Sequence, residues 1–141
     1  MTLLAEDFWR FSLQHYSKPE VKEACLLLQN HYQGNVNLAL LLAWLDNQSL
    51  TIKDWQALLP ALDTTNALLT SFRALRVQAK ASANPLYQQM LSFELEIEQQ
   101  QQAHLIHAVN QHELTTNSSP SLLERYCHSL NADILIAELS L

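Results

Sequence analysis

The stretch that decides the fold runs from Phe8 to Leu45 and reads FWRFSLQHYSKPEVKEACLLLQNHYQGNVNLALLLAWL. It contains Pro19 and the only glycine of the chain, Gly34, and these two residues divide it into three segments. Apolar residues recur in the first two segments at spacings of three and four, which is the period of one helix face. We therefore predict helices over Leu3–Tyr16, from Pro19 up to Gly34, and through the apolar run Leu38–Leu45.

The residues between these segments support the predicted boundaries. Pro19 suits the first turn of a helix, where its missing N–H costs nothing, and Gly34 suits a helix end. Asn35 or Asn37 can cap the third helix. The run Leu38–Leu45 is apolar on all sides, and a helix of that kind must be surrounded by other helices. We expect the third helix to be the central one.

Composition points to the same fold class for the whole chain. The 141 residues fit one domain, and 48% hydrophobic against 16% charged residues is typical of a globular protein. One glycine and four prolines are too few for the tight turns of a sandwich or barrel. We predict an all-α, single-domain bundle of about six or seven helices over residues 1–141, with the apolar third helix at its centre.

The second half of the chain predicts a long helical hairpin. Helical patterns cover about residues 63–83 and 85–113, and Asn84 lies at the turn between them. An antiparallel hairpin turning there brings Arg73 level with Glu94. We expect the basic face of the first helix to form ion pairs with the acidic face of the second.

Shorter features complete the prediction. Thr51 and Asp54 resemble a capping box with Asp in place of Glu. The segment 114–120, ending in TTNSSP, predicts a loop before a C-terminal helix that starts near Ser119 or Pro120. The apolar tail 134–141 is expected to dock on the core. The glutamine run 99–102 is interpreted as a solvated helix face.

Charge, hydropathy and cysteine usage exclude several classes of partner. A net charge of −6 and a pI near 5.4 argue against nucleic-acid binding, which usually needs a basic surface. The longest apolar run has eight residues, whereas a membrane span takes about 20. The N-terminus lacks the basic and apolar regions of a signal peptide. Cys25 and Cys127 form no CxxC motif and are expected to be buried free thiols, so we predict a cytoplasmic protein.

Catalytic motifs are missing from the sequence. It has no GxSxG motif, and a single glycine excludes the glycine-rich phosphate loops. Cys25 lies in ACLLLQ on a face that should be buried, where a thiol is inert. His104 and His107 share a helix face and could reach one metal ion, but the Glu-x-x-His pattern of helical di-iron proteins is absent. We expect no cofactor and no metal.

Several residues of the first third remain as candidates for binding. Aromatic residues are concentrated there, and Trp and Tyr suit the rim of a groove because their polar tips need partners. Asn37 lies at the N-terminal end of the apolar helix, where its amide could cap the helix or hydrogen-bond a ligand in a pocket. The candidate binding residues are Trp9, Arg10, Tyr16, Gln29, His31, Asn37 and Trp44.

The same first third resembles a known family. FWRFSLQHY, Pro19, ACLLLQ, Gly34 and VNLALLLAWL match the motif of a family of uncharacterised proteobacterial helical proteins, a domain of unknown function. Glu20 follows Pro19 where many relatives would have glycine. The later helices resemble the family more weakly, and the tail from Thr115 is not covered. The resemblance implies a single cytoplasmic helical domain in bacteria and brings no activity with it.

Two functional hypotheses follow from these observations. The leading one is a non-enzymatic cytoplasmic binding or adaptor module with a protein partner. The alternative is a small-ligand binder or enzyme with a pocket between helices, metal-assisted through His104 and His107 in one version. A homodimer through the helix at 85–113 is a third hypothesis, motivated by its apolar stripe of Met90, Phe93 and Ile97.

Overall fold

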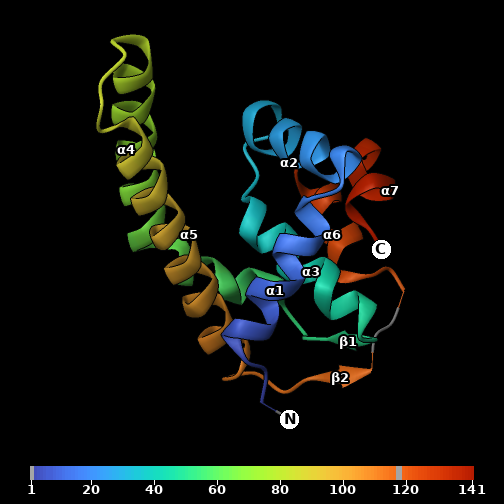
Figure 1. Cartoon of the computed structure of the whole chain (residues 1–141). Helices are drawn as coiled ribbons and strands as arrows, with labels where there is room; N and C mark the ends of the chain where they lie inside the picture. The colour runs from blue at the N-terminus through green and yellow to red at the C-terminus, as the bar shows by residue number, and fades with distance from the viewer. Residues whose placement is uncertain (1, 117–118) are drawn as a thin grey trace.

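A central apolar helix is surrounded by other helices and flanked by one long hairpin (Figure 1). The computed structural model describes residues 2–116 and 119–141. It confirms the all-α fold class, with one small pair of strands. In chain order the elements are α1 (Ala5–Tyr16), α2 (Pro19–His31), α3 (Val36–Asn47), β1 (Leu50–Thr51), the 3-10 helix η1 (Trp55–Leu62), α4 (Asp63–Ala81), α5 (Tyr87–Val109), β2 (Thr115–Thr116), α6 (Leu122–Ser129), the 3-10 helix η2 (Asp133–Leu135) and α7 (Ile136–Leu139).

Helix α3 lies at the centre, as its apolar sequence predicts. All eight residues of Leu38–Leu45 are buried, and α1, α2, α5, α6 and α7 pack around the helix. Phe8 of α1 stacks on Trp44 with ring centroids 5.3 Å apart. Each fully buried leucine or phenylalanine stabilises the fold by about 1.5–3 kcal/mol relative to exposure. We call α3 and the helices α1, α2, α6 and α7 around it the body of the protein, as distinct from the α4–α5 hairpin.

The glycine after α2 has a different role from a left-handed helix terminator. Helix α2 ends at His31, and the residue with positive φ (59°) is Gln33 rather than Gly34. A Cβ placed on Gly34 would lie 2.6 Å from Cγ of Leu28 and 3.0 Å from Cδ1 of Leu130. Glycine is needed here because the backbone passes against two side chains of the body.

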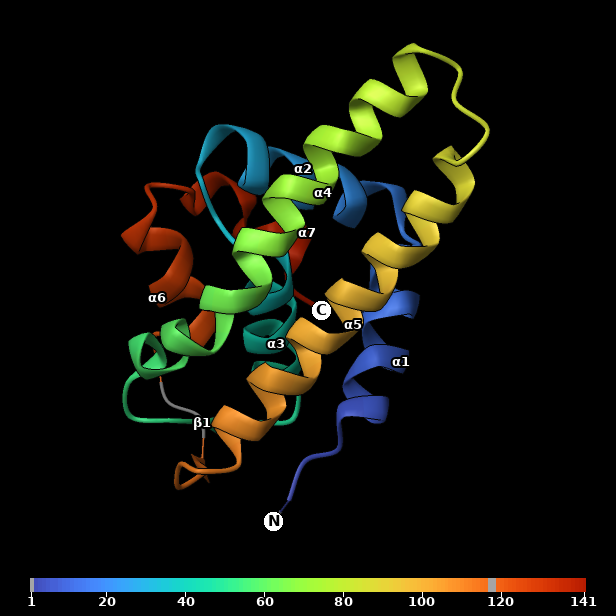
Figure 2. The same ribbon diagram turned by 90° about the vertical axis from the view of Figure 1, so that its left-hand side faces the viewer.

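The long hairpin forms as predicted, with the expected register. Helix α4 runs antiparallel to α5, which at 23 residues is the longer of the two (Figure 2). Nε of Arg73 lies 3.3 Å from one oxygen of Glu94, and Nε of Arg76 contacts the other. Lys80, the third cation of this face, lies instead over the ring of Tyr87, 5.9 Å from its centroid.

The apolar stripe of α5 changes character along its length. Ile97 is buried against the body, Met90 is half-buried, and Phe93 is half-exposed and stacks on Phe72 with centroids 4.8 Å apart. The change follows from the arrangement in Figure 1, where the outer part of the hairpin projects past the body and packs only on itself. A homodimer through this stripe stays a prediction.

The predicted loop at 114–120 begins as a strand. Strand β2 pairs antiparallel with β1, and Leu50 stands opposite Thr116. The loop prediction is therefore wrong for the two residues of β2, because backbone pairing with a distant segment is invisible in a local pattern of Thr, Asn and Ser. Residues 117 and 118 lie outside the described part of the chain.

The predicted capping box at Thr51 and Asp54 is also wrong. Thr51 belongs to strand β1, and Asp54 itself caps the 3-10 helix η1 by accepting a hydrogen bond from the backbone N–H of Gln56 at 2.9 Å. Both residues keep a structural role, but they act in separate elements.

Helix α6 begins at Leu122, two or three residues later than predicted. Ser121 caps it and forms a capping box with Glu124. The carboxylate of Asp46, at the end of α3, also accepts hydrogen bonds from the N–H groups of Leu122 and Leu123, both at 3.0 Å. This carboxylate ties the C-terminal helix to the central one.

The apolar tail docks on the body, as expected. Leu135 and Leu139 are buried, and Nε2 of His15 lies 2.8 Å from the carbonyl oxygen of Leu139. Among the described helices, none has both the length and the apolar character needed to span a membrane.

We predict that a substitution at Gly34 destabilises the protein and that one at its neighbour Gln33 does not. Gly34→Ala should lower the free energy of unfolding by about 1–3 kcal/mol, because its Cβ overpacks Leu28. Gln33→Gly should leave stability within about 1 kcal/mol of the parent, because glycine accepts the positive φ at no steric cost. Urea unfolding measures both, and a tolerated Gly34→Ala would contradict the close approach.

Candidate functional site

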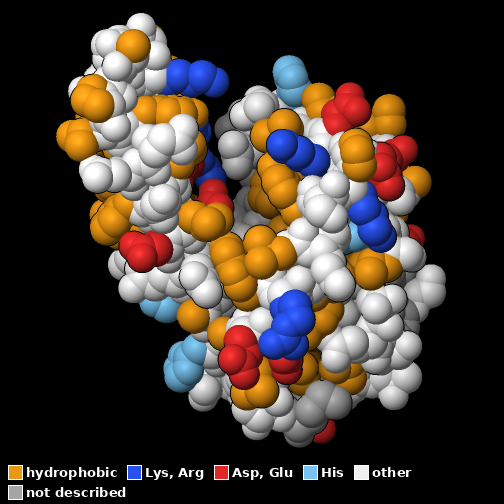
Figure 3. Space-filling view, viewed as in Figure 1, with side chains coloured by type: hydrophobic (Ala, Val, Ile, Leu, Met, Phe, Trp, Pro, Cys, Tyr) orange, Lys and Arg blue, Asp and Glu red, His pale blue; other side chains and the backbone are white. Residues whose placement is uncertain are grey.

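A cavity opens between the hairpin and the body. Figure 3 shows it as a hollow between the two parts, and its volume is about 530 Å³. Its wall is built from α1, the end of α2, the loop after it, the start of α3, and the facing sides of α4 and α5. Four of the residues expected to bind line it, namely Trp9, Tyr16, Gln29 and Asn37.

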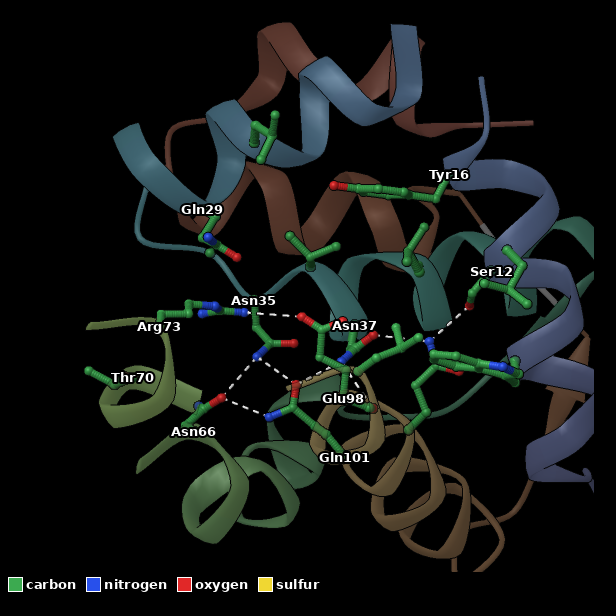
Figure 4. Close-up of a pocket in the computed structure, with 18 of the residues that line it drawn as sticks. Ser12, Tyr16, Gln29, Asn35, Asn37, Asn66, Thr70, Arg73, Glu98 and Gln101 are labelled. Carbon is green, nitrogen blue, oxygen red and sulfur yellow. Dashed lines mark hydrogen bonds and ion pairs between the residues drawn. The ribbon is translucent and has the colours of Figure 1, made fainter. Parts of the chain in front are cut away.

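The floor of the cavity starts from the cap of α3. Oδ1 of Asn35 accepts the N–H of Leu38 at 2.8 Å, so Asn35 rather than Asn37 is the cap. Because Oδ1 of Asn35 is hydrogen-bonded to the helix, Nδ2 of the same amide points to the opposite side. Nδ2 donates to Oδ1 of Asn66 at 3.1 Å and to Oε1 of Gln101 at 3.3 Å (Figure 4).

The next amide in this network is fully buried. Gln101 is 1% exposed, and its Oε1 also accepts from Nδ2 of Asn37 at 2.9 Å. Its Nε2 donates to Oγ1 of Thr65 at 2.9 Å and to Oδ1 of Asn66 at 2.8 Å. Each hydrogen-bonding position on this buried amide therefore has a partner, as burial of a polar group requires.

The network ends at a group without a partner. Oδ1 of Asn37 accepts from Nε2 of Gln102 at 3.0 Å, and the same nitrogen donates to Oγ of Ser12 at 3.0 Å. Oε1 of Gln102 is buried and has no hydrogen-bond partner among the described residues. Because the cap sets the direction of each successive amide, the last one is left with an open acceptor beside the cavity.

The glutamine run is therefore only partly the solvated face that the sequence suggests. Gln99 and Gln100 are exposed, but the interpretation is wrong for Gln101 and Gln102, each 1% exposed. Their partners come from α1, α3 and α4, and nothing in four consecutive glutamines reveals which side of the helix those elements cover.

An ion-pair cluster forms the charged part of the wall. Buried Glu94 binds Arg73 and Arg76, as described above, and Nη2 of Arg73 lies 3.6 Å from Oε1 of Glu98. The side chains of Arg73 and Glu98 are each 33% exposed and line the cavity. Burial raises the pKa of the Glu98 carboxyl, and the nearby guanidinium of Arg73 does not offset that effect.

The opposite wall supplies aromatic and apolar surface. Trp9, Leu13 and Tyr16 of α1 face the cavity, and Figure 4 shows the hydroxyl of Tyr16 reaching across it towards Gln29. Burial raises the pKa of Tyr16, so its phenol stays protonated at neutral pH.

Three of the residues expected to bind lie away from the cavity. Arg10 is exposed on the other side of α1 and pairs with Asp7 at 3.3 Å. His31 is exposed at the end of α2, and Trp44 is buried against Phe8. Sequence reasoning missed Ser12, Asn66, Thr70, Gln101 and Gln102, whose only signal was polarity inside otherwise helical patterns.

Neither the histidine pair nor the cysteines form a reactive centre. His104 is half-buried and His107 is exposed, and residues 2–116 and 119–141 contain no group of three His, Cys, Asp or Glu side chains placed to hold a metal ion. Cys25 and Cys127 are buried free thiols, as expected. Burial raises their pKa to about 12 and about 11, so both stay protonated at neutral pH.

The cavity lies in the part of the chain that matches a known family. The profile of a family described as "Protein of unknown function (DUF2390)" matches residues 7–105. The chain belongs to this family. Every residue that lines the cavity, from Trp9 to Gln102, lies inside the matched range, whereas β2, α6 and α7 lie outside it. No curated protein and no solved structure matches the chain.

We predict that two adjacent glutamines respond differently to the same substitution. Gln101→Leu should lower the free energy of unfolding by about 1–3 kcal/mol, because the amides of Asn37 and Asn66 lose a buried partner. The matched change Gln100→Leu, on the exposed face, should stay within about 0.5 kcal/mol of the parent. Urea unfolding separates the two, and equal effects would contradict the buried network.

Glu98 should lower stability at neutral pH. Its folded pKa is raised above the unfolded value, so the penalty for folding the charged form is complete above the folded pKa and disappears below the unfolded one. Glu98→Gln should therefore be at least as stable as the parent at pH 7, and the difference should shrink as pH falls to about 4. Exposed Glu96→Gln is the control, and a loss of stability in Glu98→Gln at pH 7 would contradict this account.

Proposed function

We propose that the protein is a non-enzymatic binding protein that holds a small polar organic ligand in the cavity between the α4–α5 hairpin and helices α1–α3. The observation that supports this most directly is the cavity itself, which combines a floor of ordered side-chain amides with the oppositely charged Arg73 and Glu98 on its wall.

The composition of the wall supports a ligand of metabolite size. A volume of about 530 Å³ falls within the usual range of small-molecule sites. Such sites combine apolar surface with a few oriented polar groups, and here Trp9 and Leu13 face the amides of Asn37 and Gln101. Because the amides are already held by one another, ligand binding would cost little ordering of the protein.

The residues that line the cavity favour a binding function over a catalytic one. Among the residues that the structure describes, the cavity lining includes no histidine, cysteine or aspartate, and the hydroxyl of Ser12 is bonded to an amide rather than to a base. Glu98 and Tyr16 are the lining residues able to exchange a proton, and neither is hydrogen-bonded to a nucleophile. Catalysis of the nucleophilic type needs that pairing.

A small ligand also fits the structure better than a protein partner. Of the residues expected to form a docking surface, Trp44 is buried and Arg10 is engaged by Asp7. Tyr16 and Asn37 face into the cavity rather than outwards (Figure 4). The aromatic residues of α1 therefore line a cavity that can surround a small molecule.

We also propose that residues 1–141 form one domain that works in the bacterial cytoplasm. A hydrophobic cluster extends from Leu3 to Leu139 and includes Leu38–Leu45 of α3, which supports one domain. The buried, unpaired Cys25 and Cys127 support a reducing compartment.

Filling the cavity tests the proposal. A thermal-shift panel of amino acids, nucleosides, sugars and polyamines should contain a compound that raises the Tm by several degrees, since about 2.7 kcal/mol is gained at 100 times Kd. Thr70→Trp, at the cavity wall on α4, should weaken that compound at least about tenfold. Ser71→Trp, one residue away and outside the lining, should not. A panel with no binder, or binding that survives Thr70→Trp, would contradict the proposal.

A further inference from the structure

We infer that the ligand is a small zwitterion with an ammonium and a carboxylate on neighbouring atoms, as in a free α-amino acid. Arg73 would receive the carboxylate and Glu98 the ammonium, both within the cavity described above. The inference rests on the proposed binding function and adds to it the chemical class of the ligand.

The balance of charge in the cavity excludes an ion of one sign. Arg73 and Glu98 are the charged side chains of the lining, and they stand 3.6 Å apart with opposite signs. A ligand with net charge would leave one uncompensated charge in a partly desolvated site, which is costly. A zwitterion laid antiparallel to this ion pair places each of its charges against the opposite one and leaves the site neutral.

Arg73 is held in a way that leaves half of its guanidinium available. Glu94 is buried and binds Nε of Arg73 at 3.3 Å, while its second oxygen binds Arg76. The anchored Nε fixes the plane of the group, and Nη2 extends along the cavity towards Glu98. A guanidinium presented in this way offers N–H donors in the fork that suits a carboxylate.

Glu98 lacks the donors that a carboxylate needs. Within residues 2–116 and 119–141, its ion-pair partner is Nη2 of Arg73, at 3.6 Å, a distance too long for a good hydrogen bond, although two thirds of the Glu98 side chain is covered. The raised pKa of Glu98 has the same cause, since burial is not balanced by donors. An ammonium carries three N–H donors and would supply them.

The distance between Arg73 and Glu98 suits a ligand whose own two charges are close together. Because the cation and anion of the protein are separated by only 3.6 Å, the ligand's own charges must be separated by about one carbon to meet both. The rest of the wall joins Trp9 and Leu13 to the side-chain amides of Gln29 and Asn37. This surface takes a side chain with an apolar stem and an uncharged polar end.

Calorimetric titration with matched ligands tests the inference. A panel of free L-amino acids with uncharged side chains should include one that binds the parent protein and binds the Thr70→Trp variant more weakly. Its N-acetyl derivative, which lacks the ammonium, and its carboxamide, which lacks the carboxylate, should each bind at least about tenfold more weakly. Moving the amino group to the far end of the chain, as in 6-aminohexanoate, should weaken binding in the same way.

Two variants separate recognition from folding. Glu98→Gln should lose at least about tenfold in affinity for the amino acid while its urea unfolding at pH 7 stays at least as stable as the parent. The N-acetyl derivative has no ammonium to pair with Glu98 and is an anion, so Glu98→Gln should bind it at least as tightly as the parent does. Exposed Glu96→Gln should behave as the parent with every ligand.

The outcomes distinguish this inference from the function on which it rests. If a nucleoside or sugar binds in the cavity and no amino acid does, the inference is wrong and the binding function stands. If an amine or a carboxylate alone binds as tightly as the amino acid, the inference is also wrong. If nothing on either panel binds, the inference and the proposed function both fail.

Discussion

The cap of the central helix is the interaction on which the cavity depends. Oδ1 of Asn35 accepts the N–H of Leu38, and this commitment decides which side of the amide faces the hairpin. From there the donors and acceptors of Gln101, Asn37 and Gln102 follow in one direction. One hydrogen bond at a helix start thus orders polar groups from α1, α3, α4 and α5, because a buried amide has to satisfy both of its ends.

The ion-pair cluster of the α4–α5 hairpin has two roles, one structural and one in binding. Glu94 joins Arg73 and Arg76 and so fixes the register of α4 against α5, which is a structural task. Glu98, one turn further along α5, sits in the same cluster with a single distant cation and a raised pKa. A carboxylate kept in that condition adds little to folding, so its position beside the cavity is better explained by what it can bind.

Much of the fold was predictable because it follows from local chemistry. The apolar run of α3, the proline at the start of α2 and the opposite charges of Arg73 and Glu94 each act over one or two helical turns, and each was placed correctly. Errors arose where a partner came from far along the chain. Strand β2 was hidden because its partner is β1, and the role of Gly34 was missed because its packing against Leu28 and Leu130 depends on the tertiary arrangement.

By itself, the sequence determined that this chain is a helical bundle around α3 with a charged hairpin beside it, since periodicity and composition set which faces avoid water. Only the tertiary structure decided which polar residues meet. Gln100 and Gln101 are chemically identical neighbours, yet one is solvated and the other buried in the amide floor. The reason is that a hydrogen bond across helices depends on how those helices cross, and side-chain packing sets that crossing.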